Sequence, residues 1–213
     1  MLDGKNVGLA EAVAGNLNVA VRPHEIADLA RSVRGDLGAT PVVSVAAGVA
    51  VSAIASCLDA GARVGRVMPN VAAAVCAGVF LLAAGSLGGA EDDVRRLFGV
   101  LGEVIPVDES LFEAATVLSG CVPGFAALMM EPLEEAGTVA GLDRDTARRL
   151  VARAFVGAGE LVAAGSAPAE LCASVSSPGG MTAAGVAALR SAAVPAALRY
   201  AYDAALRRGG ELE

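Results

Sequence analysis

One short stretch combines the residue types that hold a small anion. Within SSPGGMT at 176–182, proline fixes one φ angle, and the two glycines allow a tight turn with positive φ. An alanine-rich helical pattern begins directly after it. Such a turn directs backbone N–H groups and two hydroxyls to one point, as helix N-termini that bind anions do. The candidate residues are Ser177, Pro178, Gly179, Gly180 and Thr182. An ordinary connection between two helices is the alternative interpretation.

Composition excludes several classes of function. The chain has 213 residues, a net charge of −7, 3% aromatic residues and no tryptophan, which argues against a nucleic-acid surface and against base stacking. It has one histidine and no CxxC pair, so we expect no metal site. The four cysteines are predicted to be buried thiols of a reducing compartment: Cys57, Cys76, Cys121 and Cys172. No signal-peptide pattern is present, which predicts a cytoplasmic protein.

Two uncharged stretches, 37–58 and 71–90, approach the ~20 residues that span a bilayer. Both are rich in Ala, Gly, Ser and Val and lack flanking Trp or Tyr. Glycines and a proline divide them into pieces of strand and helix size. We therefore expect deeply buried elements of a soluble protein and no membrane segment.

The first half of the chain alternates between strand and helix patterns. We expect helical turns at 9–14, a strand at 16–21, a helix from Pro23, a strand at 42–45 and a helix that ends near 58. This order is typical of a parallel sheet, whose ligands bind at the carboxyl ends of its strands. Those ends carry Val21, Arg22 and Pro23 in one case and Ala46, Ala47 and Gly48 in the other.

Further strands are predicted at 63–70, which ends in Met68, Pro69 and Asn70, at 75–83, and at a sheet edge at 103–107, with a helix at 91–101 between the last two. Beyond this point the pattern is helical, with helices expected at 109–119, 123–140, 143–164, 167–175, 182–190 and 191–208. The change predicts two domains, an α/β part at 1–107 and an all-α part at 108–213. The later helices are apolar over wide faces, so a partner chain is expected.

Seven segments, taken in order along the chain, resemble the pyrroline-5-carboxylate reductases of proline biosynthesis. They are AVRP (20–23), SVAAGV (44–49), RVMPN (66–70), GEVIPVDE (102–109), LSGCVPG (118–124), EAG…GL (135–142) and SSPGGMT (176–182). The resemblance implies a partial Rossmann-like parallel sheet followed by a helical dimerisation domain. It also implies hydride transfer from NADPH or NADH to the imine carbon of 1-pyrroline-5-carboxylate, or of a related cyclic imine, to give proline. A homodimer or higher homo-oligomer through the C-terminal helices is implied as well.

The resemblance assigns roles to individual residues. Nine would contact the cofactor: Val21, Arg22 and Pro23 at one strand end, and Ala46, Ala47, Gly48, Met68, Pro69 and Asn70 beside the nicotinamide. Ser177, Gly179 and Gly180 would hold the substrate carboxylate. Thr182 would approach the imine nitrogen and deliver or orient its proton, which makes it the candidate catalytic residue.

The chain departs from the family pattern at three places. Only 15 residues precede the strand at Asn16, and they contain no GxGxxG and no predicted strand, so the turn that binds the pyrophosphate is not found and the sheet edge needs a cover. Cys121 and Val122 replace a small polar residue and a glycine, and Val71-Ala72 replaces Thr-Pro. A cofactor-deficient, non-catalytic relative that dimerises or binds a small carboxylate is therefore the alternative function. The product of a shortened gene is the other possibility.

Overall fold

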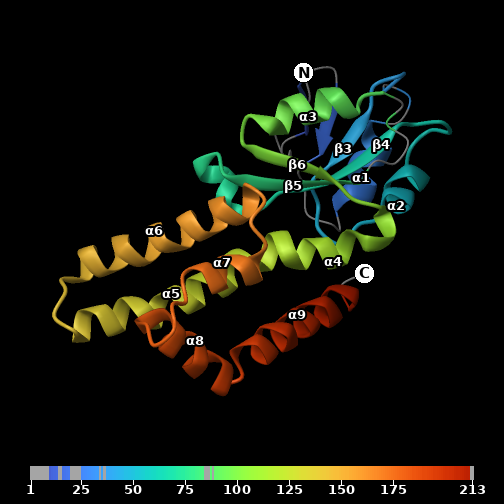
Figure 1. Ribbon diagram of the computed structural model, residues 1–213. Helices are drawn as coiled ribbons and strands as arrows, with labels where there is room; N and C mark the ends of the chain where they lie inside the picture. Colours follow the sequence, from blue (N-terminus) through green and yellow to red (C-terminus); the bar gives the residue numbers. More distant parts are fainter. Residues whose placement is uncertain are drawn as a thin grey trace. The chain divides into compact units, whose positions relative to one another are not determined.

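The computed structural model describes residues 10–13, 16–19, 25–33, 35, 37–83, 87 and 89–211 (Figure 1). The chain forms two compact units that divide after Pro123. The helical unit is Gly124–Asp203, and the residues from Ala204 onward group with the first, sheet-containing unit. The predicted combination of an α/β part and an all-α part is confirmed.

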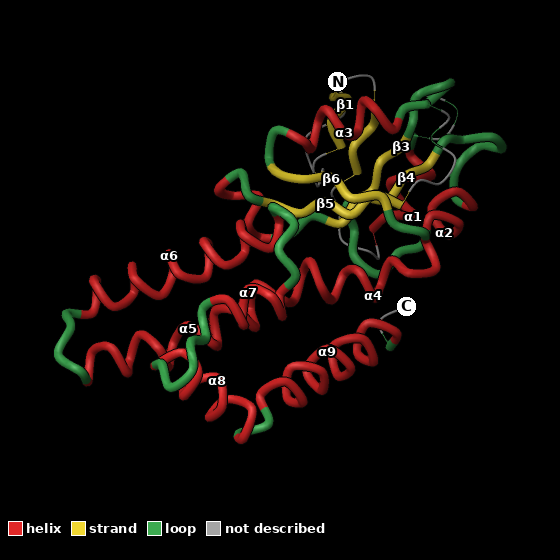
Figure 2. The backbone as a smooth tube through the Cα atoms, in the orientation of Figure 1, coloured by secondary structure: helices red, strands yellow, loops and turns green. Residues whose placement is uncertain are grey.

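Among the described residues, six strands form one mixed sheet in the order β1-β2-β3-β4-β5-β6 (Figure 2). Their bounds are Ala10–Val13, Asn16–Val19, Val42–Ser44, Val64–Met68, Gly78–Ala83 and Gly102–Pro106. The pairs β2–β3, β3–β4 and β5–β6 are parallel, whereas β1–β2 and β4–β5 are antiparallel. The predicted strands at 42–45, 63–70 and 75–83 are thus confirmed with shorter bounds, and the strand at 103–107 is confirmed one residue earlier, at an edge as expected. The strand predicted at 16–21 is confirmed over 16–19, and residues 20 and 21 lie outside the described residues.

The sheet has helices on both faces because successive residues of a strand point to opposite sides. Val42 packs with residues of α1 (Ile26–Ser32) and α2 (Val51–Ser56), including Ile26 and Ile54. Its neighbour Val43 packs on the other face with Val94 of α3 (Glu91–Gly99). The β-branched runs of the central strands are therefore buried on both sides, as in other sheets covered by helices.

One expectation for the sheet is wrong, and two strand pairs depart from an otherwise parallel arrangement. Residues 10–13 form strand β1 rather than helical turns, so a strand does precede Asn16, and β1 pairs with the edge of β2. Only residues 14 and 15 separate the two strands, a separation typical of a hairpin, and this local pairing outweighs the weak strand propensity of Ala-Glu-Ala-Val. The sheet is also not uniformly parallel, because β5 returns beside β4 in the opposite direction after the short 3-10 helix η2 (Val71–Val75).

A continuous helical segment runs from residue 109 to residue 139. It contains the 3-10 turn η3 (Glu109–Leu111), α4 (Phe112–Thr116), a π-helical turn η4 (Val117–Cys121) and α5 (Val122–Val139). The predicted break before Pro123 is wrong. Proline lacks an N–H and its ring crowds the carbonyl four residues earlier, here that of Ser119, and a wider π turn relieves that crowding without ending the helix.

The remaining helices are α6 (Arg144–Ala163), α7 (Pro168–Ser174), α8 (Met181–Ser191) and α9 (Val194–Gly210). All four were predicted, with ends shifted by a few residues. In the helical unit, α5 and α6 run antiparallel and side by side (Figures 1 and 2), joined by Glu134 of α5, which accepts two hydrogen bonds from Arg148 of α6. Ala147 of α6 is the only buried residue between Gly124 and Asp203, all of which is described.

The uncharged stretches at 37–58 and 71–90 contain the short elements β3, α2, η2 and β5, in keeping with the expectation of strand-sized and helix-sized pieces. Within the described chain, the helix Glu109–Val139 is long and apolar enough to cross a bilayer, with a mean hydropathy of 1.5 over its most apolar window. The bent pair α8 and α9 passes the same test only when it is taken as one span. One or two such helices are weak evidence of a membrane segment.

Candidate functional site

The ends of β3 and β4 bring two of the predicted cofactor segments together. The strands are parallel, and Ser44 near the end of β3 pairs with Arg66 of β4. The segment 46–48 therefore leaves the sheet beside the segment 68–70. Ala46 is buried and its N–H donates to the Ser44 hydroxyl over 3.3 Å, whereas Ala47 is exposed. The result is a surface of small side chains and backbone at the carboxyl ends of parallel strands, where α/β sheets bind ligands.

The side chain of Asn70 makes two hydrogen bonds that hold this edge. Its amide Nδ2 donates to the Ser119 carbonyl over 2.9 Å, and its Oδ1 accepts from the Val79 N–H over 3.1 Å. Asn70 therefore ties the end of β4 to the π-helical turn and to β5.

The π-helical turn supplies the carbonyl that Asn70 binds. Pro123 has no N–H to donate to Ser119, the residue four positions before it, so that carbonyl is open to the Asn70 amide. The hydroxyl of Ser119 is buried and has no hydrogen-bond partner within the described chain. π turns are frequent at functional sites, and this one contains Cys121, one of the departures from the family pattern.

The SPGG segment forms a tight turn at the start of α8. The Gly180 N–H donates to the Ser177 carbonyl over 2.9 Å, with Pro178 second and Gly179 third in the turn. Gly179 has φ +72°, the position that a type II turn reserves for glycine. A Cβ on Gly180 would lie 2.5 Å from Ser177 Oγ. Gly179 is thus required by the turn itself, whereas a Cβ on Gly180 would force the Ser177 side chain to move.

The N-terminus of α8 leaves several donors free. The first helical hydrogen bond runs from the Ala184 N–H to the Gly180 carbonyl, so the N–H groups of Met181, Thr182 and Ala183 precede the helical ladder. The hydroxyls of Ser177 and Thr182 are on exposed residues and have no hydrogen-bond partner in the described structure. The turn therefore offers unpaired donors to an anion.

The predicted residues fall into three groups. Val21, Arg22 and Pro23 lie outside the described residues. The segments 46–48 and 68–70 lie together on the sheet unit. The substrate residues Ser177, Gly179, Gly180 and Thr182 form one turn in the helical unit.

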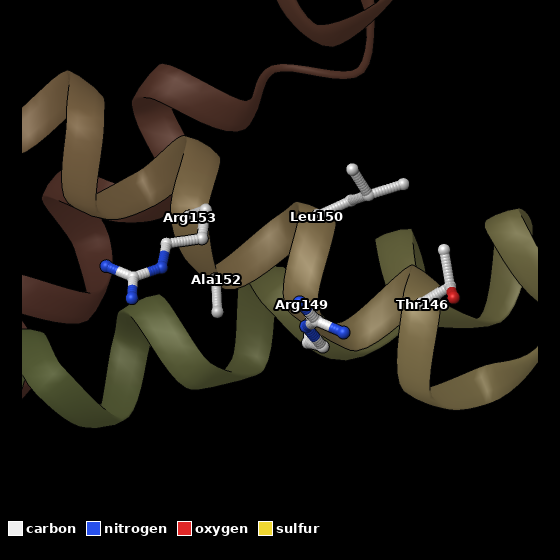
Figure 3. A pocket seen from close by; sticks show the side chains of 5 residues that line it. All are labelled: Thr146, Arg149, Leu150, Ala152 and Arg153. Carbon is white, nitrogen blue, oxygen red and sulfur yellow. The ribbon is translucent and has the colours of Figure 1, made fainter.

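Other clusters offer no competing chemistry. The four cysteines have free thiols, but the prediction that they are buried is wrong, since Cys76 is exposed and the other three are half-buried. The described residues contain no group of three or more His, Cys, Asp or Glu that could hold a metal ion. Figure 3 shows a shallow pocket whose side chains all project from α6, among them Arg149 and Arg153. None of the predicted site residues lines it.

The sequence pattern did not point to Arg66, a buried arginine beside the edge formed by 46–48 and 68–70. Arg66 of β4 is 2% exposed and lies against Glu113 at 2.7 Å and against the ring of Phe112. The available signal was a single charged residue inside the otherwise apolar strand VGRVM.

Comparison with known proteins decides the family. The dimerisation domain of pyrroline-5-carboxylate reductase matches residues 109–212. A pyrroline-5-carboxylate reductase of Thermus thermophilus is 37% identical over 211 residues, which cover 97% of this chain and 77% of the relative. The chain belongs to the pyrroline-5-carboxylate reductase family.

Other members of the pyrroline-5-carboxylate reductase family agree with this assignment. The Synechocystis enzyme is 36% identical over 95% of this chain and 77% of its own length. The solved structure of the Coxiella burnetii reductase has a TM-score of 0.87 at 30% identity and covers 97% of this chain and 80% of that chain. The Plasmodium falciparum reductase, solved with NADP bound, has a TM-score of 0.81 at 25% identity, over 92% of this chain and 80% of that chain.

Family membership identifies the chain as one of a family of oxidoreductases with a Rossmann-like sheet and a dimerisation domain. The dimerisation domain accounts for the wide apolar faces of its helices, because such faces are covered by a partner chain in an oligomer.

Proposed function

We propose that this chain reduces 1-pyrroline-5-carboxylate, or a closely related cyclic imine, to proline, with NADPH or NADH as the hydride donor. It would work in the cytoplasm as a homodimer or higher homo-oligomer, joined through its C-terminal helices. The observation that carries the proposal is its 37% identity to a pyrroline-5-carboxylate reductase over 97% of its length, which spans both candidate segments. The dinucleotide part would end at residue 107 and the dimerisation and substrate part would begin at residue 108.

The edge formed by 46–48 and 68–70 fits the nicotinamide end of the cofactor. Ala46, Ala47 and Gly48 have little or no side chain, so a flat ring can approach the backbone closely. Asn70 fixes the neighbouring segment by its two hydrogen bonds, so this surface is formed before a ligand arrives. Val21, Arg22 and Pro23 would complete the edge at the preceding strand.

The turn before α8 fits the carboxylate of the substrate. Free N–H groups at 181–183 and the Ser177 hydroxyl would bind its oxygens, with the positive end of the helix dipole behind them. Gly179 and Gly180 would act by allowing the turn, because the Gly180 N–H is already paired with Ser177. The protein thereby fixes the orientation of the ring that carries the imine.

Thr182 would deliver or orient the proton at the imine nitrogen. Its exposed hydroxyl can both donate and accept, so it can hold the N–H of the protonated imine in place. The nicotinamide supplies the hydride. No side-chain acid–base pair is required, because a protonated imine is already electrophilic at carbon.

The first experiment is a calorimetric titration of the purified chain with NADPH and then with NADH, followed by a turnover assay with the cyclic imine. The proposal predicts saturable binding of one nucleotide and imine-dependent oxidation. If neither nucleotide binds and no turnover is seen, the proposal is wrong and the non-catalytic alternative takes its place.

Variants of the turn test the roles of its residues. We expect Thr182→Val to lower kcat by roughly a hundredfold, since it removes the hydroxyl that orients the proton. Gly180→Ala should raise KM for the imine about tenfold, the equivalent of one strong hydrogen bond, because its Cβ would displace Ser177. Gly185→Ala is the matched control, since a Cβ there meets nothing within 4 Å inside the same helix. Equal KM values for the two alanine variants would contradict the carboxylate role.

A further inference from the structure

A buried ion cluster lies next to the edge formed by residues 46–48 and 68–70, which is called the nicotinamide edge from here on. Arg66 is the only charged residue among the buried side chains of the described chain, and its side chain is 3% exposed. Its Nη2 lies 2.7 Å from Glu113 Oε1, and its Nη1 lies 3.9 Å from Glu109 Oε1. Its guanidinium carbon lies 4.3 Å from the centre of the Phe112 ring. A charge withdrawn from water in this way needs such partners to remain in the fold.

The cluster connects three segments that are distant in sequence. Arg66 belongs to β4, two residues before Met68. Glu109 Oε1 also accepts the N–H of Val51 over 3.0 Å, and Val51 is the first residue of α2, three positions after Gly48. Through Glu109, the arginine therefore holds the far end of the loop that begins at Ala46.

Apolar packing follows the same path. Phe112 is fully buried with Leu81 and Ala83, and both Val51 and Met68 pack against this group. The charged contacts and the apolar contacts thus converge on the two segments that form the nicotinamide edge. Asn70 fixes this edge at one point, and the Arg66 cluster fixes it at another.

We propose that Arg66 is a positioning residue for nucleotide binding and hydride transfer, which sets the spacing between the 46–50 loop and the end of β4 through Glu109, Glu113 and Phe112. This inference rests on the proposed function. Arg66 itself touches no reactant. Its planar guanidinium donates to Glu113 and also lies within ion-pair distance of Glu109, so a lysine, which offers a single ammonium, replaces it only in part.

The test compares Arg66→Met, Arg66→Lys and Arg96→Met in the full chain. Arg96 is the matched control, because it is an exposed arginine of α3 that, among the described residues, pairs with Asp93 of the same helix alone. We expect Arg66→Met to speed amide hydrogen exchange at 45–52 and 67–70 in the nucleotide-free protein, with α1 unchanged. We expect NADPH binding to weaken roughly tenfold, with partial recovery in Arg66→Lys and parental values in Arg96→Met.

The kinetic isotope effect separates positioning from loss of folded protein. With nicotinamide deuterated at the transferred position, a misplaced ring slows hydride transfer and raises the isotope effect on kcat. A smaller folded fraction lowers the rate and leaves the isotope effect and the dissociation constant unchanged. If Arg66→Met does not fold, Glu109→Gln and Glu113→Gln take its place, with the same exchange and binding measurements.

The inference is overturned if a folded Arg66→Met protein has the hydrogen exchange, the NADPH affinity and the isotope effect of the parent. If that protein does not fold, the same result in both glutamine variants overturns it. Either result leaves the proposed function standing. Failure of the parent chain to bind nucleotide would overturn both.

Discussion

The sheet unit and the helical unit bury their apolar side chains in different ways. In the sheet unit, Val43, Phe80 and Phe112 are all at most 2% exposed. In the helical unit, Leu128 is 69% exposed and Val139 is 84% exposed, and Ala147 alone is buried. The first unit folds around a core of its own, whereas the second presents an apolar surface that needs a cover. In a family with a dimerisation domain, a second copy of the chain is the natural cover.

The largest expected effect lies in the sheet unit. Phe112→Ala should lower the free energy of unfolding by about 3–5 kcal/mol, since it leaves a cavity beneath Arg66. The adjacent Leu111 is 56% exposed, and Leu111→Ala should change the free energy of unfolding by no more than about 0.5 kcal/mol. Denaturant unfolding at one protein concentration measures both. Similar values for the two variants would show that Phe112 is not part of a self-contained core.

In the helical unit, we expect a substitution on the apolar surface to change self-association of the chain. We expect Leu128→Ala to weaken self-association by about 1–2 kcal/mol, because an apolar contact with the second copy is lost. Sedimentation measures the dimer dissociation constant, and the midpoint of thermal unfolding should depend on protein concentration. Val75 is 76% exposed in the sheet unit, so Val75→Ala is the control and should leave self-association unchanged. If the chain is a monomer whose thermal midpoint does not change with protein concentration, the helical unit does not depend on a second copy and the contrast in burial between the two units has no such cause.

The smallest effect concerns the ion pair that joins α5 and α6. The hydrogen bonds from Arg148 lower the pKa of Glu134 below its ordinary value of 4.5 and raise the pKa of Arg148. A carboxyl whose folded pKa is lowered stabilises the fold above its unfolded pKa, and this stability is lost as the pH falls through the folded pKa. The melting temperatures of the parent and Glu134→Gln should therefore differ at neutral pH and converge below pH 4.5. Glu131→Gln removes a charge from the same helix but no ion pair of the described chain, so it serves as the control.

The central strands and most helices were predictable because their local patterns are strong. Residues 42–45 contain three valines and only one polar residue, Ser44, and Glu91 to Gly99 places acidic residues in the first turn of an amphipathic helix. The turn at Ser177 was predictable for the same reason, since Pro178 and two glycines allow few conformations.

The features that were missed depend on contacts between distant residues. Strand β1 depends on pairing with β2, because Ala-Glu-Ala-Val has only a weak strand propensity. The direction of β5 follows from where the chain returns after η2. The π turn reflects Pro123 inside a helix, and no local pattern indicates that Asn70 binds the freed carbonyl.

The open apolar face of the helical unit also has a genetic consequence. A chain damaged only in its sheet unit keeps this face, so it can still pair with an intact chain. In a cell that expresses both forms, intact subunits would be drawn into mixed assemblies. We therefore expect chains altered only at the 46–48 and 68–70 segments to co-purify with co-expressed intact chains, and chains altered on the apolar face not to do so.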